Sequence, residues 1–335
     1  MPQVSPITLF VKHRSWLGIL LIAIIASANA FAASDKAIQG EQMLQAAIAK
    51  NDIRELPSFE MKANLKLDNY GHPIDGTYSL LWNGPNQWRE EINLPGYSEI
   101  QVTGKDAASV KRTTQYMPWQ INLIHDILGY DQKLKLGENE KVKQIRNREI
   151  RGIKVSCVEI AGKFGSRQVC TDPSNGALVR ELPFVDGKLT TVAEKQFPFS
   201  LSYVDHEKIL AEATITELKT PVQFSISEFD PPAGGVSKPK CDGEKVQSGR
   251  LVTRVNPTYP SAQRMARVQG TVKLYGVIGT DGMLHGLEVV SSVDPALDSS
   301  ALQAVQQWRY EPYTCNGVPV EVESVVQVNY SLNPY

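Results

Sequence analysis

Two histidine–carboxylate pairs are the residues whose chemistry stands out first. His125-Asp126 and Asp205-His206 each place an imidazole beside a carboxylate, as general acid–base catalysis requires. Neither pair is accompanied by a recognisable third catalytic group or by a G-x-S-x-G turn for a nucleophile. We therefore interpret both as surface pairs and predict that the protein is not an enzyme and uses no cofactor. An enzyme of unrecognised type is the alternative.

The four cysteines are the next candidates for covalent chemistry. The segments around Cys157 and Cys170 are predicted to form a hairpin that turns at residues 162–165. In a two-stranded hairpin, the residue numbers of any two directly opposed residues add up to the same value. Gly162 and Gly165, at the two ends of the turn, give the same value as Cys157 and Cys170, so the two cysteines are expected to lie opposite each other. We therefore predict a Cys157–Cys170 disulfide and, by elimination, a second one between Cys241 and Cys315. Four buried free thiols are the alternative.

No metal site is predicted. None of the cysteines has the short spacing that is typical of zinc ligands, and the five histidines are scattered along the chain.

The first 33 residues predict a targeting segment. Basic residues at 12–14 precede an apolar run at 16–25, and small residues at 28–32 fit an A-x-A cleavage pattern. The apolar run is shorter than the roughly 20 residues of a membrane span, yet no charge occurs between Arg14 and Asp35. Residues 1–33 are therefore either a cleaved signal peptide or a membrane anchor. In both cases the rest of the chain is exported.

The distribution of charge argues against nucleic acid as a partner. The chain has 35 Lys plus Arg and 36 Asp plus Glu, and residues 250–335 hold six basic and seven acidic side chains. Binding to nucleic acid requires a concentrated basic stripe that displaces counterions. The sequence contains none.

Residues 36–229 are predicted to form one β-rich domain. Apolar residues recur near a 3.6-residue period over 36–50, which favours a helix, and short alternating runs separated by turns follow from residue 59. A second helix is predicted at Pro118–Leu128. This pattern indicates an α+β fold with a large antiparallel sheet and helices on one face. The Pro- and Gly-rich stretch 230–249 is predicted to be a linker.

Residues 250–335 are predicted to form a small module with its own core. One helix begins at Pro260, and Asp298 is expected to cap another. Trp308 falls in helical register with the apolar residues of that second helix. We assign Trp308 to the structural core together with Tyr310 and Pro312.

Three antiparallel strands complete this module, at residues 271–278, 284–291 and 320–330. In the last strand the even positions are mostly apolar and the odd positions mostly polar, which suits a sheet covered by helices on one side only. This strand ends the chain, and we therefore expect it at the edge of the sheet. An edge strand exposes main-chain N–H and C=O groups that an extended peptide can join.

The motifs of this module resemble those of the TonB C-terminal domain in order and spacing. The resemblance covers about residues 250–333 and implies a periplasmic domain that pairs its sheet edge with a peptide of an outer-membrane transporter or another envelope protein. Carried over by position, the partner-binding residues are Tyr259, Glu321, Glu323, Val326, Gln327, Val328 and Tyr330. The motifs are Tyr259-Pro260, Gly270-Thr271-Val272, Asp281-Gly282, Leu297-Asp298 with Ala301, Trp308-Arg309-Tyr310-Glu311-Pro312 and Gly317-Val318-Pro319-Val320.

The same resemblance implies coupling to a proton-driven motor of the inner membrane. An energy transducer, anchored through the N-terminal segment, is therefore a further hypothesis. The chain departs from that pattern because it lacks a long Pro-rich spacer, and a cleaved leader would remove the anchor. Both departures put energy coupling in doubt and leave peptide binding intact.

The N-terminal domain more loosely resembles the outer-membrane lipoprotein carrier (LolA-like) fold. Its opening helix, strand-rich middle and the turn at 170–176 support this resemblance. That fold is a curved half-barrel with helices over its mouth and an apolar cavity for acyl chains. The resemblance implies an alternative function as a periplasmic carrier of lipid or another apolar ligand, with Trp82, Trp88 and Trp119 as candidate lining residues. Ordinary core or surface aromatic residues are the other interpretation of these tryptophans.

Overall fold

The computed structural model describes residues 35–332, except residues 70, 105–106, 130–133, 163–164, 182, 206, 240–245 and 248. The chain divides into two compact units, which we describe separately. The first contains Leu134–Val179 together with the chain up to Ala49, and the second contains Lys50–Lys133 and Arg180–Tyr335. Within the described residues no helix is long and apolar enough to cross a membrane. The predicted leader, residues 1–33, lies outside them.

The first unit packs a helix against a three-stranded antiparallel sheet. The helix occupies residues 35–51, and the sheet has the order β6-β7-β8. Leu44 and Ile48 of the helix are buried in one cluster with side chains of all three strands. Ile38, which shares their predicted apolar period, is instead 52% exposed. The strands are β6 (Lys141–Ile150), β7 (Ile153–Gly162) and β8 (Gly165–Thr171).

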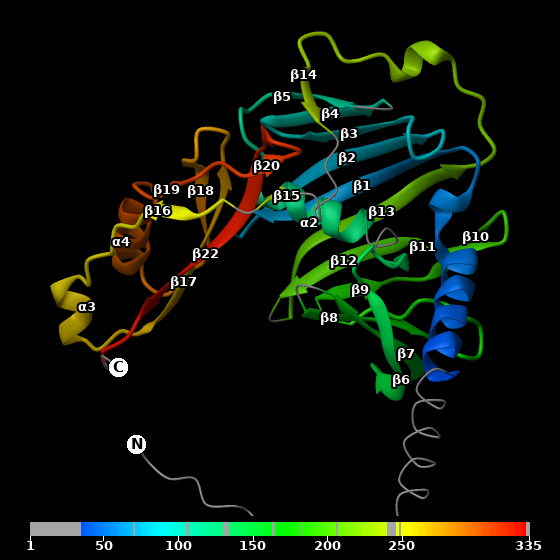
Figure 1. Ribbon diagram of the computed structural model, residues 1–335, viewed down its shortest axis with the longest axis horizontal. Coiled ribbons are helices and arrows are strands. Elements are labelled where there is room, and N and C mark those ends of the chain that lie inside the picture. Colours follow the sequence, from blue (N-terminus) through cyan, green and yellow to red (C-terminus); the bar gives the residue numbers. More distant parts are fainter. Residues whose placement is uncertain are drawn as a thin grey trace, which may run out of the picture. The chain divides into compact units, whose positions relative to one another are not determined.

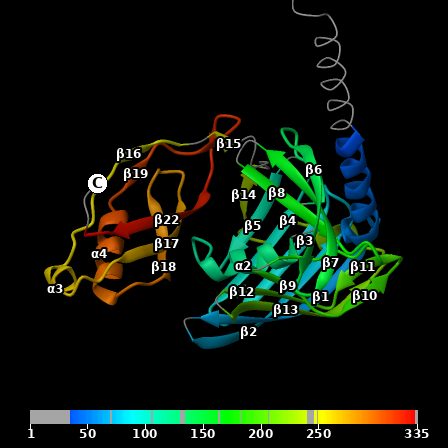
Figure 2. The same cartoon turned by 90° about the horizontal axis from the view of Figure 1, so that it is seen from below.

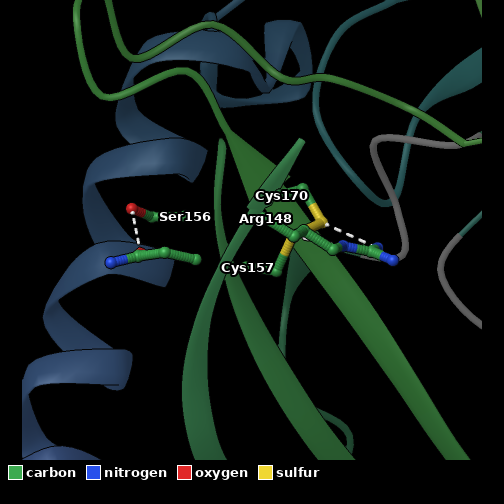
Figure 3. The surroundings of a disulfide bond; sticks show 5 residues. Arg148, Ser156, Cys157 and Cys170 are labelled. Carbon is green, nitrogen blue, oxygen red and sulfur yellow. Dashed lines mark hydrogen bonds between the residues drawn. A yellow bond between two sulfur atoms is a disulfide. The ribbon is translucent and has the colours of Figure 1, made fainter. Parts of the chain in front are cut away.

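A disulfide joins the two strands of the predicted hairpin. Cys157 of β7 lies opposite Cys170 of β8, and their sulfur atoms are 2.09 Å apart. Figure 3 shows Arg148 of β6 beside this bond, with its Nε atom 3.2 Å from the Cys157 sulfur and a terminal nitrogen 3.4 Å from the Cys170 sulfur. The prediction of this disulfide, made from the hairpin register, is confirmed.

The second unit contains an open nine-stranded antiparallel sheet (Figure 1). Its order is β14-β5-β4-β3-β2-β1-β13-β12-β9, so β14 and β9 form its two edges and the barrel is not closed. The predicted α+β class and half-barrel are confirmed in this respect. Its elements are β1 (Phe59–Asn69), β2 (His72–Trp82), β3 (Trp88–Leu94), β4 (Tyr97–Thr103), β5 (Ala107–Arg112), β9 (Phe184–Asp186), β12 (Ser200–Asp205), β13 (Lys208–Lys219) and β14 (Val236–Pro239). Beside it lie η1 (Ile53–Glu55), the hairpin of β10 (Leu189–Val192) and β11 (Lys195–Pro198), and η3 (Ile226–Phe229).

Helix α2 (Trp119–Leu128) packs over this sheet and encloses its core. Ile121, Leu123, Ile124 and Ile127 are all buried in the main apolar cluster. The helix contacts β13, where the core residues include Ala211 and Ala213. Small side chains leave room for a helix to pack closely on a sheet. The predicted helix at Pro118–Leu128 is therefore present, with Pro118 as its N-cap.

The stretch predicted as a linker, residues 230–249, supplies a strand of the large sheet. Val236–Pro239 form β14, which pairs with β5 from Val110 to Ala107. The Pro and Gly content indicated a linker, and it did not reveal that four residues would add to a sheet edge. Pro239 ends an edge strand, one of the few positions in a sheet where proline is tolerated. The domain boundaries stay a prediction.

The C-terminal module (residues 250–335) has its own three-stranded antiparallel sheet, in the order β18-β17-β22. Helix α4 contacts all three strands, as Figures 1 and 2 show. The module's elements are β16 (Leu251–Thr253), α3 (Ser261–Met265), β17 (Gly270–Ile278), β18 (Leu284–Ser291), α4 (Pro295–Val305), β19 (Arg309–Tyr310), β20 (Thr314–Cys315), β21 (Val318–Pro319) and β22 (Val322–Tyr330). Strand β15 (Val246–Gln247), just before it, pairs with β20, and β16 pairs with β19.

A polar cluster joins α2 to the large sheet. His125 Nε2 lies 3.0 Å from Glu90 Oε1, and the Tyr78 hydroxyl donates to Glu90 Oε2 at 2.9 Å. Burial opposes a charge on His125, but the Glu90 carboxylate raises the pKa of His125 to about 9. His125 holds the pKa of Glu90 below its usual value in spite of burial. The interpretation of His125 as a surface residue overlooked this partner.

Removing the disulfide should destabilise the first unit. A cross-link that closes a loop of about 15 residues contributes roughly 3 kcal/mol in the chain-entropy model. We expect a loss of that order in the Cys157→Ser/Cys170→Ser variant, measured by urea titration with hydrogen exchange read on β7. Ser156→Ala, which removes only the bond from the Ser156 hydroxyl to Asn147, is the matched control. A double variant as stable as the control would contradict the prediction.

The stability of the second unit should fall as the pH rises through about 9. The folded-state pKa of His125, about 9, is higher than the ordinary 6.5, so proton binding favours the folded protein. The contribution is complete below pH 6.5 and is lost as the pH passes 9; Glu99 and Glu323 reinforce it. Thermal unfolding between pH 6 and 10 should show this loss in the wild type and not in His125→Gln. Parallel pH profiles would refute the assignment.

Candidate functional site

Strand β22 alternates between buried and exposed side chains along its second half. Val326, Val328 and Tyr330 are buried, whereas Val325, Gln327 and Asn329 between them are exposed. Its ladder with β17 runs without interruption from Gly270↔Tyr330 to Ile278↔Val322. The predicted alternation is therefore present. The strand begins at Val322, two residues later than predicted.

Among the described residues, no strand pairs with the outer edge of β22. The sheet order ends at β22, and among the strands that the structure describes only β17 pairs with it. In an antiparallel ladder, residues alternate between pairs that are hydrogen-bonded to the neighbour and pairs that are not. Half of the N–H and C=O groups of β22 therefore point away from β17. This edge is the candidate functional site.

The core of the module holds β22 in place. Val326 and Val328 pack in one cluster with Leu297, Ala301 and Val305 of α4. The Tyr330 hydroxyl donates to the main-chain oxygen of Leu297 at 3.0 Å. Burial of one face fixes the register, because a slip by one residue would turn the apolar side chains outward.

Tyr259 and Tyr330 contact each other at the far end of the strand. Their rings are 5.4 Å apart and nearly perpendicular, and the Tyr259 hydroxyl donates to the main-chain oxygen of Val268. Tyr330, Val326 and Val328 direct their side chains inward, so they can offer a partner only main-chain groups. Of the predicted partner-binding residues, Glu323 and Gln327 have exposed side chains and Glu321 is half-buried. The assignment of all seven residues to partner binding stays a prediction.

Trp308 joins α4 to the strands before it. Its side chain is 7% exposed, and its Nε1 atom donates to the main-chain oxygen of Val255 at 2.9 Å. Tyr310 packs against the same cluster. Pro312, predicted as a third core residue, is exposed, and that part of the prediction is wrong.

Helix α4 is capped by Asp294. The prediction that Asp298 caps this helix is therefore wrong. Asp294 Oδ1 accepts from the main-chain N–H of Ala296 at 2.9 Å, and Pro295 occupies the first turn. Asp298 instead accepts from the main-chain N–H of Val293 at 3.3 Å. Both carboxylates lie at the positive end of the helix dipole, where they are stabilising.

The turn before β18 is fixed by a close main-chain approach. Gly282 has φ +73°, and a Cβ atom there would lie 2.0 Å from the main-chain oxygen of Tyr310. The Tyr310 N–H donates to the Gly282 oxygen at 2.8 Å. Only glycine fits this position. The contact explains why the Asp281-Gly282 and Trp308–Pro312 motifs occur together.

Both faces of β17 are covered. We predicted helices on one side of the sheet and solvent on the other. Tyr275 and Val277 lie on the face away from α4 and are nevertheless buried. The Tyr275 hydroxyl donates to the main-chain oxygen of Met117 at 3.2 Å, and the Trp119 ring lies 6.0 Å from the Tyr275 ring. The expectation of a solvated outer face is therefore wrong along β17.

The two cysteines outside the first unit are only partly described. Cys315 is buried and disulfide-bonded. Its predicted partner, Cys241, lies outside the described residues, so the Cys241–Cys315 pairing stays a prediction. His206 of the second histidine–carboxylate pair is also outside them. In the described part of the chain no three or more His, Cys, Asp or Glu residues cluster as a metal site would require.

The three candidate ligand-lining tryptophans pack in or against the core of the large sheet. Trp82 is buried, lies opposite Trp88 on the neighbouring strand and stacks on Phe59 at 6.0 Å. Trp88 and Trp119 are partly buried against the same cluster. This packing is what core aromatic residues do, and a role in binding an apolar ligand stays a prediction.

Residues 255–332 match a family model described as the C-terminal domain of the Gram-negative bacterial TonB protein. The predicted resemblance is confirmed. Protein TonB of Vibrio cholerae is 32% identical over 80 residues, which are 24% of this chain and 33% of that relative. Protein TonB of Klebsiella pneumoniae is 31% identical over 64 residues, which are 18% and 26% of the two chains. The chain thus spans about a third of one curated TonB relative and a quarter of the other.

A solved structure, a LolA superfamily protein from Nitrosomonas europaea, is similar to a different part of the chain. It covers 57% of this chain and 97% of its own, with 12% identity and a TM-score of 0.40. We describe the large sheet of this chain as an open half-barrel from its strand order alone, and not from this similarity.

Replacing Trp308 should unfold the TonB-type module. Trp308→Ala empties a core position and leaves the Val255 oxygen without its donor, at a cost of about 3–5 kcal/mol. We expect strongly faster hydrogen exchange of β17 and β22 in this variant. Gln306→Ala, at the exposed C-cap of α4, should leave exchange unchanged. Protection in Trp308→Ala equal to that of the control would show that the core does not depend on Trp308.

Proposed function

We propose that this protein is a periplasmic interaction protein of the TonB type, which binds an extended peptide segment of an envelope partner through the outer edge of β22. The observation that carries the proposal is the regular, unpaired edge of β22 within a module that matches the TonB C-terminal family. An outer-membrane transporter is the partner class that this family suggests. The match spans a minor part of the TonB relatives, so the proposal is confined to peptide binding.

The two edges of the module's sheet differ in their readiness to accept a strand. On the β18 side the ladder has register shifts at Lys273/Leu274 and at Tyr275/Val277, and Gly286 adopts a positive φ of 57°. Bulges of this kind are a common way to protect an edge against pairing. The β22 ladder has no such shift. The geometry therefore favours β22 as the docking strand.

The side chains along β22 also leave its edge accessible. Its nine residues include no proline and no lysine. The second half of the strand carries no charge, and its exposed residues are Val325, Gln327 and Asn329. Charges and prolines are the usual means of blocking an edge. The strand is about 30 Å long, at roughly 3.3 Å per residue, so it can pair with a peptide of several residues.

The predicted compartment fits this proposal. The Cys157–Cys170 disulfide suits an oxidising compartment such as the periplasm. The predicted leader would deliver the chain there, and anchorage in the inner membrane would follow if residues 1–33 are retained.

Photo-crosslinking in living cells tests the proposal. A p-benzoylphenylalanine at Gln327, on the exposed face of β22, should capture a partner segment, whereas the same residue at Val290 on β18 should not. The captured segment, made as a synthetic peptide, should protect β22 amides from hydrogen exchange in the purified protein. Equal capture from both edges, or protection elsewhere, would contradict edge pairing.

Proline variants distinguish main-chain pairing from side-chain contact. Adjacent residues of a strand direct their N–H groups to opposite edges. Of the two variants Ser324→Pro and Val325→Pro, one therefore removes a donor from the free edge and the other removes a donor from the ladder with β17. The variant that changes the free edge is the one that keeps native exchange protection in β17. We expect it to bind the captured peptide at least about tenfold more weakly than the wild type. Each lost hydrogen bond of the ladder contributes about 1 kcal/mol, and the proline ring also obstructs pairing. Unchanged affinity in that variant would mean that the peptide does not join the strand.

A further inference from the structure

A groove adjoins the first residues of β22. Its volume is about 610 Å³, and it lies wholly within the second unit. Val277 of β17 and residues of the segment leading into β22 line one side, and β14, Arg112 at the end of β5 and Met117 in the segment before α2 line the other. The residues of that segment are Pro319, Val320, Glu321 and Glu323. A peptide that pairs with β22 would therefore pass this groove beside the first residues of the strand.

Most of the charges in the groove already have partners. Arg112 Nε donates to Glu99 Oε2 at 2.5 Å, and the Tyr97 hydroxyl donates to the same oxygen at 2.6 Å. Lys238 Nζ lies 2.5 Å from Glu321 Oε2, with Arg112 3.8 Å from that oxygen. Both cations of the groove are thereby engaged by carboxylates.

Glu323 is the exception. No hydrogen bond or ion pair reaches its carboxylate from the described residues, and its side chain lines the groove beside Val277, its cross-strand neighbour. Partial enclosure raises the pKa of Glu323 even though Arg112 and His125 lie near it. The two cations of the groove are thus engaged by Glu321 and by Glu99, which lies outside it, and the carboxylate left without an ion pair among the described residues, Glu323, is on the docking strand itself.

We propose that the partner peptide carries a lysine or arginine opposite Glu323 and that the groove receives this side chain. The inference rests on the proposed function and names the chemistry of the partner at one position. Directly opposed side chains of antiparallel strands have Cβ atoms about 5 Å apart, within reach of an ion pair. The aliphatic stem of the basic residue would lie along Met117 and Val277, which are apolar and buried.

The position of this charge also sets the register of the peptide. Main-chain pairing alone is indifferent to sequence, and a shift by one residue turns a side chain to the opposite face of the strand. Of the residues on the outer face of β22, Glu323 is charged, while Val325, Gln327 and Asn329 are not. A basic residue at one position of the peptide therefore selects one register.

A peptide series with the full exported chain tests this inference. The probes are seven-residue peptides of alternating valine and threonine in which lysine, glutamine or glutamate is placed at each position in turn. We expect one position where lysine binds about five- to tenfold more tightly than glutamine, and no preference at the positions next to it. Glu323→Gln should abolish this preference, and Glu323→Lys should transfer it to glutamate.

Glu311→Gln is the matched control, because Glu311 lies in the same module and its partner is the exposed Arg250. It should keep the lysine preference. If peptides protect β22 from hydrogen exchange but the lysine preference is missing or survives in Glu323→Gln, the inference is wrong and the proposed function stands. If none of the peptides protects β22, both are wrong.

Discussion

The pairing of β22 with β17 is the interaction on which the rest of the C-terminal module depends. Its register is fixed from the inside, because Val326 and Val328 are held against α4 and the Tyr330 hydroxyl is bonded to the helix. A strand held in this way cannot rotate to hide its outer edge. The module therefore presents main-chain groups in a geometry that is already suitable for pairing, and in the proposed complex the ordering cost of association would fall on the peptide.

The environment of the sheet limits where a partner can approach. Its inner face is filled by α4, and Tyr275 and Val277 on the other face are buried near Met117 and Trp119. At the β18 edge, two register shifts and Gly286 interrupt the regular ladder. What is left is the edge of β22. In the proposed binding mode, this asymmetry would let a small sheet accept one guest strand while it avoids indiscriminate pairing at both edges.

Local patterns predicted this molecule well, and contacts between distant residues escaped prediction. The Cys157–Cys170 disulfide followed from the register of one hairpin, and the alternation of β22 from its own sequence. The addition of β14 to the large sheet depends on a partner strand more than 120 residues earlier, as Val236↔Val110 shows. The His125–Glu90 pair could not be read from the sequence for the same reason. One local prediction was also wrong, because two carboxylates lie near the start of α4. Asp294 caps the helix, and Asp298 accepts a hydrogen bond from the main-chain N–H of Val293 instead.

The candidate site illustrates the same division. That β22 would alternate between buried and exposed residues was predictable from its own sequence. That Glu323 would lack a cation was not predictable, because it depends on Lys238 being engaged by Glu321 and Arg112 by Glu99. Affinity for an extended peptide comes from main-chain bonds that any sequence can make, whereas selectivity must come from the few side chains beside them. Glu323, whose carboxylate has no ion pair among the described residues, is placed at the start of the proposed docking strand to supply that selectivity, since it would discriminate between registers as well as between partners.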